Sequence, residues 1–121
     1  MVSVGTKLFV GDNSGALVVK CIKILGNSTH LARIGDILVF SVQKARARRK
    51  VKRHDVRRGL LVRQRRRILR RSGAMLHFYM NTVVLLDQRG GPAASRFFGV
   101  APHEFRGKKH LKLLTLAHSV I

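Results

Sequence analysis

The chain alternates between short runs of apolar, β-branched residues and clusters of turn residues. Runs of this kind, bounded by Gly, Asn, Asp or Ser, predict β-strands. Within residues 37–43, Leu38, Phe40 and Val42 fall on one face and Ser41 and Gln43 on the other, which is the period of a half-buried strand. We expect strands at residues 6–10, 16–25, 37–43, 60–64, 75–79 and 82–87. Five or six closely spaced strands predict a closed or nearly closed β-barrel.

The C-terminal segment, residues 103–121, has a different pattern. A short helix over residues 103–109 is expected after Pro102, although Gly107 weakens it. The following run "LKLLTLA" fits either a helix or a strand. At 121 residues the chain is expected to form one domain, with the barrel over about residues 1–102 and a helical region over about 103–121.

The charge of the chain says more about its binding partner than its hydropathy does. The chain has 25 Lys and Arg against 5 Asp and Glu, a net charge of +20, although its hydrophobic content of 45% is that of an ordinary globular protein. A free protein with this charge repels itself, so we expect an anionic partner. Nucleic acid fits best, because an extended basic surface can engage many phosphates.

The charge is concentrated in residues 48–71, which hold 13 Lys and Arg and a single acid, Asp55. A solvated surface usually mixes charges of both signs, and the excess of Arg suits phosphate contacts and stacking. The central "GLLV" predicts a buried strand that anchors the run in the fold. We therefore expect a hairpin or a loop–strand–loop with one basic arm at residues 46–55 and another at residues 63–73.

The same inventory argues against catalysis and metal binding. The five acids are scattered, no phosphate-binding or nucleophile motif occurs, and six dispersed His with one Cys make no plausible zinc set. We expect no enzyme activity, no cofactor, no metal and no small-molecule substrate. Cys21 lies in an apolar run and is expected to be a buried thiol, and no stretch approaches the roughly 18 apolar residues that span a bilayer.

The densest turn signal is "DNSG", residues 12–15. It predicts a tight turn held by an Asx hydrogen bond. It could also present small polar groups to RNA, and the two interpretations are compatible.

The stretches "LFVGDNSGALVVKCIKILG", "IGDILVFSVQKA", "RKVKRHDVRRGLLVR", "FYMNTVVLLD" and "RFFGVAPHEFRGKKHLKLLTLA" together resemble the universal large-subunit ribosomal protein family numbered fourteen. The resemblance covers nearly the whole chain. It implies a mainly β fold, with a small five-stranded β-barrel, a protruding basic β-ribbon or loop and short C-terminal helices.

The resemblance also implies a non-enzymatic protein that binds large-subunit rRNA and helps form an intersubunit bridge with small-subunit rRNA. Neighbouring large-subunit proteins three and nineteen would pack against it, and a ribosome-silencing factor could dock on it. Residues 12–15 match the family's signature turn, and Lys50, Lys52 and Arg53 match its basic loop. Arg106 and Lys109 match its basic C-terminal region.

Combining the arms with the resemblance gives a set of residues expected to contact rRNA. They are Asn13, Ser14, Lys44, Arg46, Arg48, Arg49, Lys50, Lys52, Arg53, His54, Arg57, Arg63, Arg65, Arg66, Arg67, Arg70, Arg71, Arg106, Lys108 and Lys109.

The chain departs from the family pattern in three places. Residues 78–81 lack a common acidic turn, the expected Pro is displaced to Pro102, and residues 63–71 carry more Arg than the family needs. Together with the C-terminus, this divergence favours a mitochondrial ribosome over a plastid or bacterial one. The N-terminal stretch has no presequence features, which fits an organelle-encoded or already processed chain. The alternative hypothesis is a non-ribosomal basic β-barrel of the translation-factor or nucleoid type.

Overall fold

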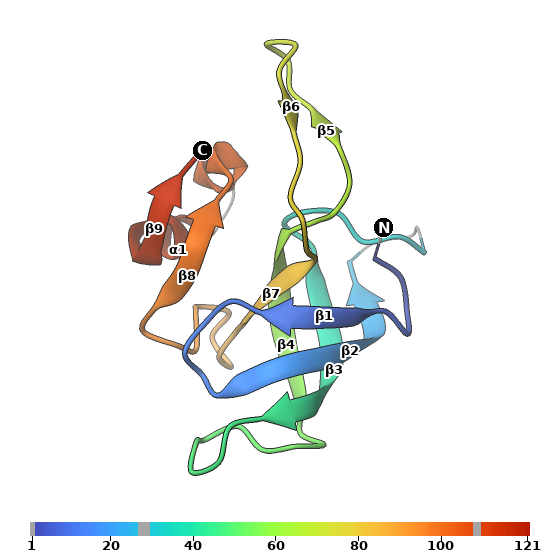
Figure 1. The fold of residues 1–121 in the computed structure, drawn as a ribbon, viewed down its shortest axis with the longest axis vertical. Helices are drawn as coiled ribbons and strands as arrows, with labels where there is room; N and C mark the ends of the chain where they lie inside the picture. Colours follow the sequence, from blue (N-terminus) through green and yellow to red (C-terminus); the bar gives the residue numbers. More distant parts are fainter. Residues whose placement is uncertain (1, 27–29, 108–109) are drawn as a thin grey trace.

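Five strands close into a barrel in the computed structural model, which describes residues 2–26, 30–107 and 110–121 (Figure 1). Neighbouring strands are antiparallel, except that the last pairs in parallel with the first and so closes the sheet. The strands, in their order around the barrel, are β1 (Lys7–Val10), β2 (Ala16–Leu25), β3 (Ile37–Ala45), β4 (Val56–Arg63) and β7 (Thr82–Leu85). The predicted mainly β, five-stranded barrel is confirmed.

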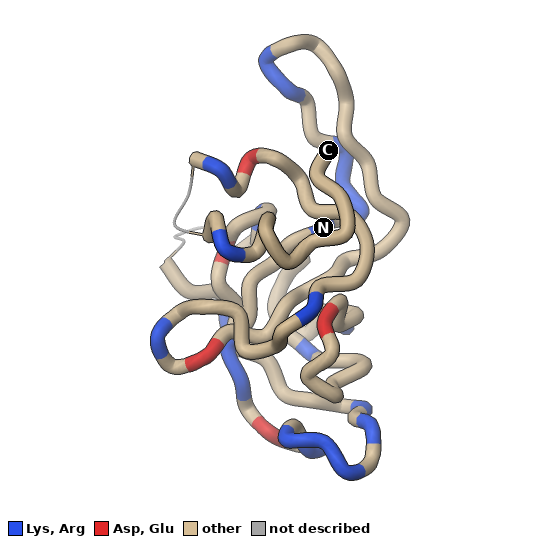
Figure 2. The backbone as a smooth tube through the Cα atoms, turned by 90° about the vertical axis from the view of Figure 1, so that its left-hand side faces the viewer, with Lys and Arg blue, Asp and Glu red and all other residues tan. Residues whose placement is uncertain are grey.

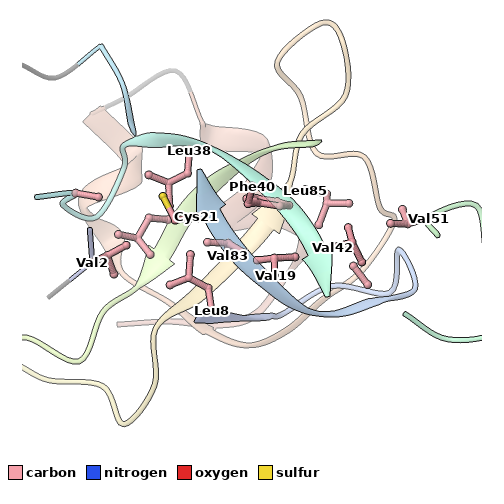
Figure 3. Packing of buried hydrophobic residues seen from close by; sticks show 13 residues of the cluster. Val2, Leu8, Val19, Cys21, Leu38, Phe40, Val42, Val51, Val83 and Leu85 are labelled. Carbon is pink, nitrogen blue, oxygen red and sulfur yellow. The ribbon is translucent and has the colours of Figure 1, made fainter. Parts of the chain in front are cut away.

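The barrel interior is filled by alternate residues of these strands (Figure 3). Leu38, Phe40 and Val42 are fully buried, so the face assigned to them from the sequence is confirmed. Cys21 is also buried, as expected. Because successive side chains of a strand point to opposite faces, the residues between them are left on the outside of the barrel.

Two barrel strands, β4 and β7, are buried on both faces. Leu61 and Val83 face the barrel interior, whereas Leu60 and Val84 belong to a second apolar cluster on the outside. Burial on both sides explains why these strands read as the continuous apolar runs "GLLV" and "TVVLL" rather than as alternating sequences.

The C-terminal region supplies the rest of this second cluster. It consists of β8 (Phe97–Ala101), the 3₁₀ helix η1 (His103–Gly107), α1 (Leu111–Leu116) and β9 (Ala117–Val120). The expectation that the barrel extends to about residue 102 is wrong, because residues 97–101 form β8, which pairs in parallel with β9 in a separate sheet. Phe97 and Phe105 pack against the outside of the barrel instead of entering it. The ambiguous run is helical through Leu116, and β9 begins at its last residue, Ala117.

A two-stranded ribbon protrudes from the barrel between β4 and β7 (Figure 1). It is built from β5 (Ile68–Leu69) and β6 (Met75–Leu76), so the strand expected at residues 75–79 is only two residues long. Conversely, β4 begins at Val56 rather than at residue 60, because the exposed residues 56–58 pair with β3.

Candidate nucleic-acid interface

The two basic arms lie at opposite ends of strand β4. Residues 46–55, the basic loop, precede β4, and residues 65–76, the basic hairpin, follow it. Figure 2 shows Lys and Arg gathered at these two extremes of the molecule. Of the two arrangements that the sequence left open, the loop–strand–loop is therefore the one observed. The eight residues of β4 separate the arms by about 26 Å, since a strand rises about 3.3 Å per residue.

The basic loop is anchored to the barrel although its charged side chains face solvent. Val51 is buried and belongs to the barrel core, which fixes the middle of the loop (Figure 3). At its end, the His54 amide donates to the Val42 carbonyl (2.8 Å), and the Asp55 carboxylate accepts from the Lys52 amide (3.0 Å). The loop therefore presents a set of exposed predicted residues in one place: Arg46, Arg48, Arg49, Lys50, Lys52, Arg53 and His54.

The signature turn at residues 12–15 supports this loop. Gly15 has φ +107°, and a Cβ there would lie 2.4 Å from Cβ of Arg49. The Gly15 carbonyl also accepts a hydrogen bond from the Arg46 amide (2.8 Å). A glycine is required here both by the left-handed backbone and by the close approach of the basic loop.

Within that turn, Asp12 is the organising residue. One carboxylate oxygen accepts from the Ser14 amide (3.0 Å), which confirms the predicted Asx hydrogen bond. The other accepts from the Leu85 amide (2.9 Å), a link between the turn and β7 that the sequence did not reveal. Asn13 bonds the Ser95 hydroxyl and the Arg96 amide, and the Ser14 hydroxyl bonds Asp12. The side chains predicted to reach RNA from this turn are thus engaged within the protein.

The basic hairpin carries exposed arginines along its rising strand. Arg65, Arg66 and Arg67 lead into β5, and Arg71 stands at the tip, all of them exposed. Arg70 differs, because its guanidinium lies 2.7 and 3.3 Å from the two carboxylate oxygens of Glu104 and 2.6 Å from the Ile121 carbonyl.

This ion pair ties the hairpin to η1. Burial by itself would raise the pKa of Glu104, but the hydrogen bonds and the charge of Arg70 outweigh it and hold that pKa below its usual value. Arg70 was predicted to bind RNA, and in the structure its Nε and one terminal nitrogen donate to protein acceptors.

Arg63 is likewise directed into the protein. Its guanidinium lies 5.3 Å from the centre of the Phe97 ring and donates to the Phe98 carbonyl (3.0 Å). A Cβ at Gly99 would meet it at 2.6 Å, so glycine at that position of β8 leaves room for it. Burial lowers the pKa of this guanidinium, as expected for a cation withdrawn from water. Arg63 fastens β8 to the barrel.

The remaining predicted residues are dispersed. Lys44 is exposed near the end of β3, and Arg57 is exposed on β4 with its guanidinium 3.7 Å from Asp55. Arg106 is exposed on η1, apart from both arms along the chain. Lys108 and Lys109 lie outside the described residues.

Internal contacts occupy all five carboxylates of the chain. Asp12, Asp36, Asp55 and Asp87 each accept hydrogen bonds from backbone amides, and Glu104 is paired with Arg70. Across the described ranges, ion pairs are limited to those of Asp55 with Arg57 and Glu104 with Arg70. Apart from Arg70, the arginines and lysines of the two arms therefore have no ion-pair partner within the described protein.

Two exposed lysines belong to the basic surface but were not anticipated. Lys7 of β1 and Lys20 of β2 lie directly opposite each other on the outside of the barrel. The signal that could have found them is their alternation with the buried residues Leu8, Val19 and Cys21. Among the described residues there is no group of three or more potential metal ligands and no helix long enough to span a membrane.

A family model described as ribosomal protein L14p/L23e matches residues 1–121, the whole chain. The structure supports that match with a closed barrel, a signature turn and a basic protruding ribbon. A ribosomal family also decides between the two hypotheses drawn from the sequence, in favour of the ribosomal one. The chain belongs to the L14p/L23e family of ribosomal proteins and is a structural protein of the large ribosomal subunit.

Proposed function

We propose that this protein binds large-subunit rRNA through the basic loop and the basic hairpin, and that it holds two RNA segments apart. The observation that carries the proposal is the placement of two exposed cation clusters at the two ends of β4, where only Arg70 forms an ion pair with an acid. Phosphates are the anions that such clusters neutralise in a ribosome.

The separation of the arms also supports a role in bridging the subunits. A single basic patch would engage one RNA surface, whereas arms about 26 Å apart, at the spacing of an eight-residue strand, can engage two. In this proposal one arm is embedded in large-subunit rRNA and the other reaches small-subunit rRNA. Ribosomal proteins three and nineteen as neighbours, and a silencing factor as a docking partner, rest on the family resemblance alone.

We further propose a mitochondrial ribosome as the site of action. The support is the divergence at residues 78–81 and the additional arginines over residues 63–71. Sedimentation of a tagged chain with mitochondrial large subunits is the expected result, and sedimentation only with plastid or bacterial subunits would contradict it.

RNA binding through the arms can be tested by salt dependence. Each phosphate contact contributes a slope of about 0.9 to log K against log salt for a duplex, so removing three contacts lowers the slope by about 2.7. We expect this reduction on rRNA fragments for Arg48, Arg49 and Lys50 changed to Ser, and for Arg65, Arg66 and Arg67 changed to Ser.

The matched control changes three exposed cations outside both arms, Lys23, Arg89 and Lys112, to Ser. For this control, the slope of log K against log salt should fall by less than about 1 relative to the wild type. If the control lowers the slope as much as the arm variants do, binding is a diffuse effect of net charge and the proposal fails.

A further inference from the structure

A groove crosses the outer face of the barrel where β1, β2 and β3 lie side by side. Its volume is about 440 Å³, within the range of sites for small ligands. It ends against the basic loop, which contributes Arg53. The lining residues are Lys7, Leu8, Phe9, Val18, Gln43, Lys44 and Arg53.

The groove carries positive charge that the protein does not balance. Lys7, Lys44 and Arg53 are exposed, none of them takes part in either ion pair of the described residues, and no carboxylate lines the groove. In addition, Lys7 lies directly opposite Lys20 in the antiparallel pair of β1 with β2. Like charges directly opposite each other destabilise a sheet, and an anion bound between them would relieve this repulsion.

The groove also has an aromatic surface. Phe9 is 48% exposed although it lies in a barrel strand, and it pairs directly with Val18, whose other neighbour is Lys44. The Phe9 ring, the Val18 methyl groups and the Lys44 side chain are thus cross-strand neighbours on β1, β2 and β3. Gln43 donates from its amide nitrogen to the Ser41 hydroxyl (2.8 Å), so its amide oxygen remains as an acceptor at the groove.

An aromatic face, cations and a fixed amide together match the chemistry of a nucleotide. A base stacks on the ring, the flanking phosphates meet the cations, and the amide oxygen accepts from a base N–H. The Phe9 ring distinguishes this site from the two arms. Neither the basic loop nor the basic hairpin contains a Phe, Tyr or Trp.

We propose that the groove holds one unstacked nucleotide of single-stranded RNA, with its base against Phe9 and its phosphates on Lys7, Lys44 and Arg53. One exposed ring provides one stacking position rather than a platform for several bases. The inference rests on the proposed RNA-binding function and deepens it, because it assigns a single-stranded segment to the barrel face.

The test compares two RNA probes on the full-length chain, an oligouridylate of about 12 nucleotides and a duplex of the same length. Replacing Phe9 with Ala should weaken oligouridylate binding about 5- to 150-fold, the range of one base–aromatic stacking contact, and should leave duplex binding unchanged. Phe9→Tyr retains the ring and should retain binding. The control, Phe98→Ala, removes a 54%-exposed ring of β8 outside the groove and should change neither probe.

Equal losses on both probes, no loss on oligouridylate, or the same loss in the Phe98 control would overturn the inference. So would competition by polyglutamate at charge-matched concentration as effective as that by oligouridylate, because the groove would then suit an acidic peptide. Crosslinking of a 4-thiouridine probe to the wild-type chain provides a readout that does not depend on folding of the variants. Crosslinks should map to residues 7–10, and a complete absence there would refute the site. Loss of all RNA binding by the wild-type chain would instead refute the proposed function.

Discussion

Gly59 on β4 is the position where a single added methyl group should damage the barrel most. A Cβ there would lie 2.3 and 2.7 Å from two ring carbons of Phe40 and 2.8 Å from the Val84 carbonyl oxygen. Phe40 is fully buried in the barrel core, so its ring has nowhere to move. Gly59→Ala therefore forces the ring or β7 to shift.

The cost can be bounded from these contacts. Overpacking a core costs typically 1–3 kcal/mol, and three contacts below 3 Å, one with backbone, place Gly59→Ala near the upper end at about 3 kcal/mol. Alanine also lowers the conformational entropy of the unfolded chain, which offsets about 0.4–1 kcal/mol of this loss of stability. A net loss of about 2 kcal/mol lowers Tm by roughly 6–12 °C in a domain of this size.

Thermal unfolding followed by circular dichroism measures this loss. Gly107→Ala is the matched control, because a Cβ there meets nothing within 4 Å and the backbone is not left-handed. Its Tm should stay constant or rise by a few degrees. A Tm for Gly59→Ala within about 2 °C of wild type would refute the reasoning.

A double mutant identifies the cause. In a Phe40→Leu background the two ring atoms are gone, so Gly59→Ala should cost at least about 1 kcal/mol less than in the wild type. Some cost should persist through the Val84 carbonyl. Strict additivity within about 0.5 kcal/mol would show that the Phe40 ring is not responsible.

Further predictions concern the buried contacts of the site. Arg70→Lys should lower stability by about 1 kcal/mol, since a lysine cannot form the two-pronged contact with Glu104; chemical denaturation measures it. The pKa of Glu104 is lowered in the folded state, so its ion pair stabilises the fold above about pH 4.5 and this contribution is lost as the pH falls through the folded-state pKa; Glu104→Gln should flatten that acid limb. Asp12→Ala should cost about 2–4 kcal/mol, because two backbone amides, that of Leu85 fully buried, lose their acceptor, and Asp12→Asn should cost less. Burial raises the pKa of the Cys21 thiol despite an opposing backbone hydrogen bond, so alkylation at pH 8 should be slow until the chain is unfolded.

Local patterns were sufficient to predict the barrel strands, apart from the first four residues of β4. The alternation at Leu38, Phe40 and Val42 is produced by the same pleat that directs these side chains inward, so the sequence contains the information directly. The turn at Asp12 was also predictable, because an Asx hydrogen bond spans only two residues.

The internal role of two arginines was not predictable in this way. Arg63 donates to a carbonyl 35 residues away, and Arg70 pairs with a carboxylate 34 residues away. Nothing in an arginine-rich run distinguishes these two from their exposed neighbours, because the partners come from β8 and η1 and meet the run only after folding. The same reason applies to β8, whose parallel partner β9 lies beyond α1.

Strand β4 also constrains how the chain can change in length. The basic loop and the basic hairpin are surface segments, so insertions at their tips leave the barrel intact. A one-residue insertion within β4 would instead turn Leu61 outward and Leu60 inward, exchanging the barrel core with the cluster under the C-terminal region. A two-residue insertion preserves the faces but moves the arms about 6.6 Å further apart. The exposed tips of the arms can therefore vary in length among ribosomes, while the distance between the arms changes only in steps of two residues.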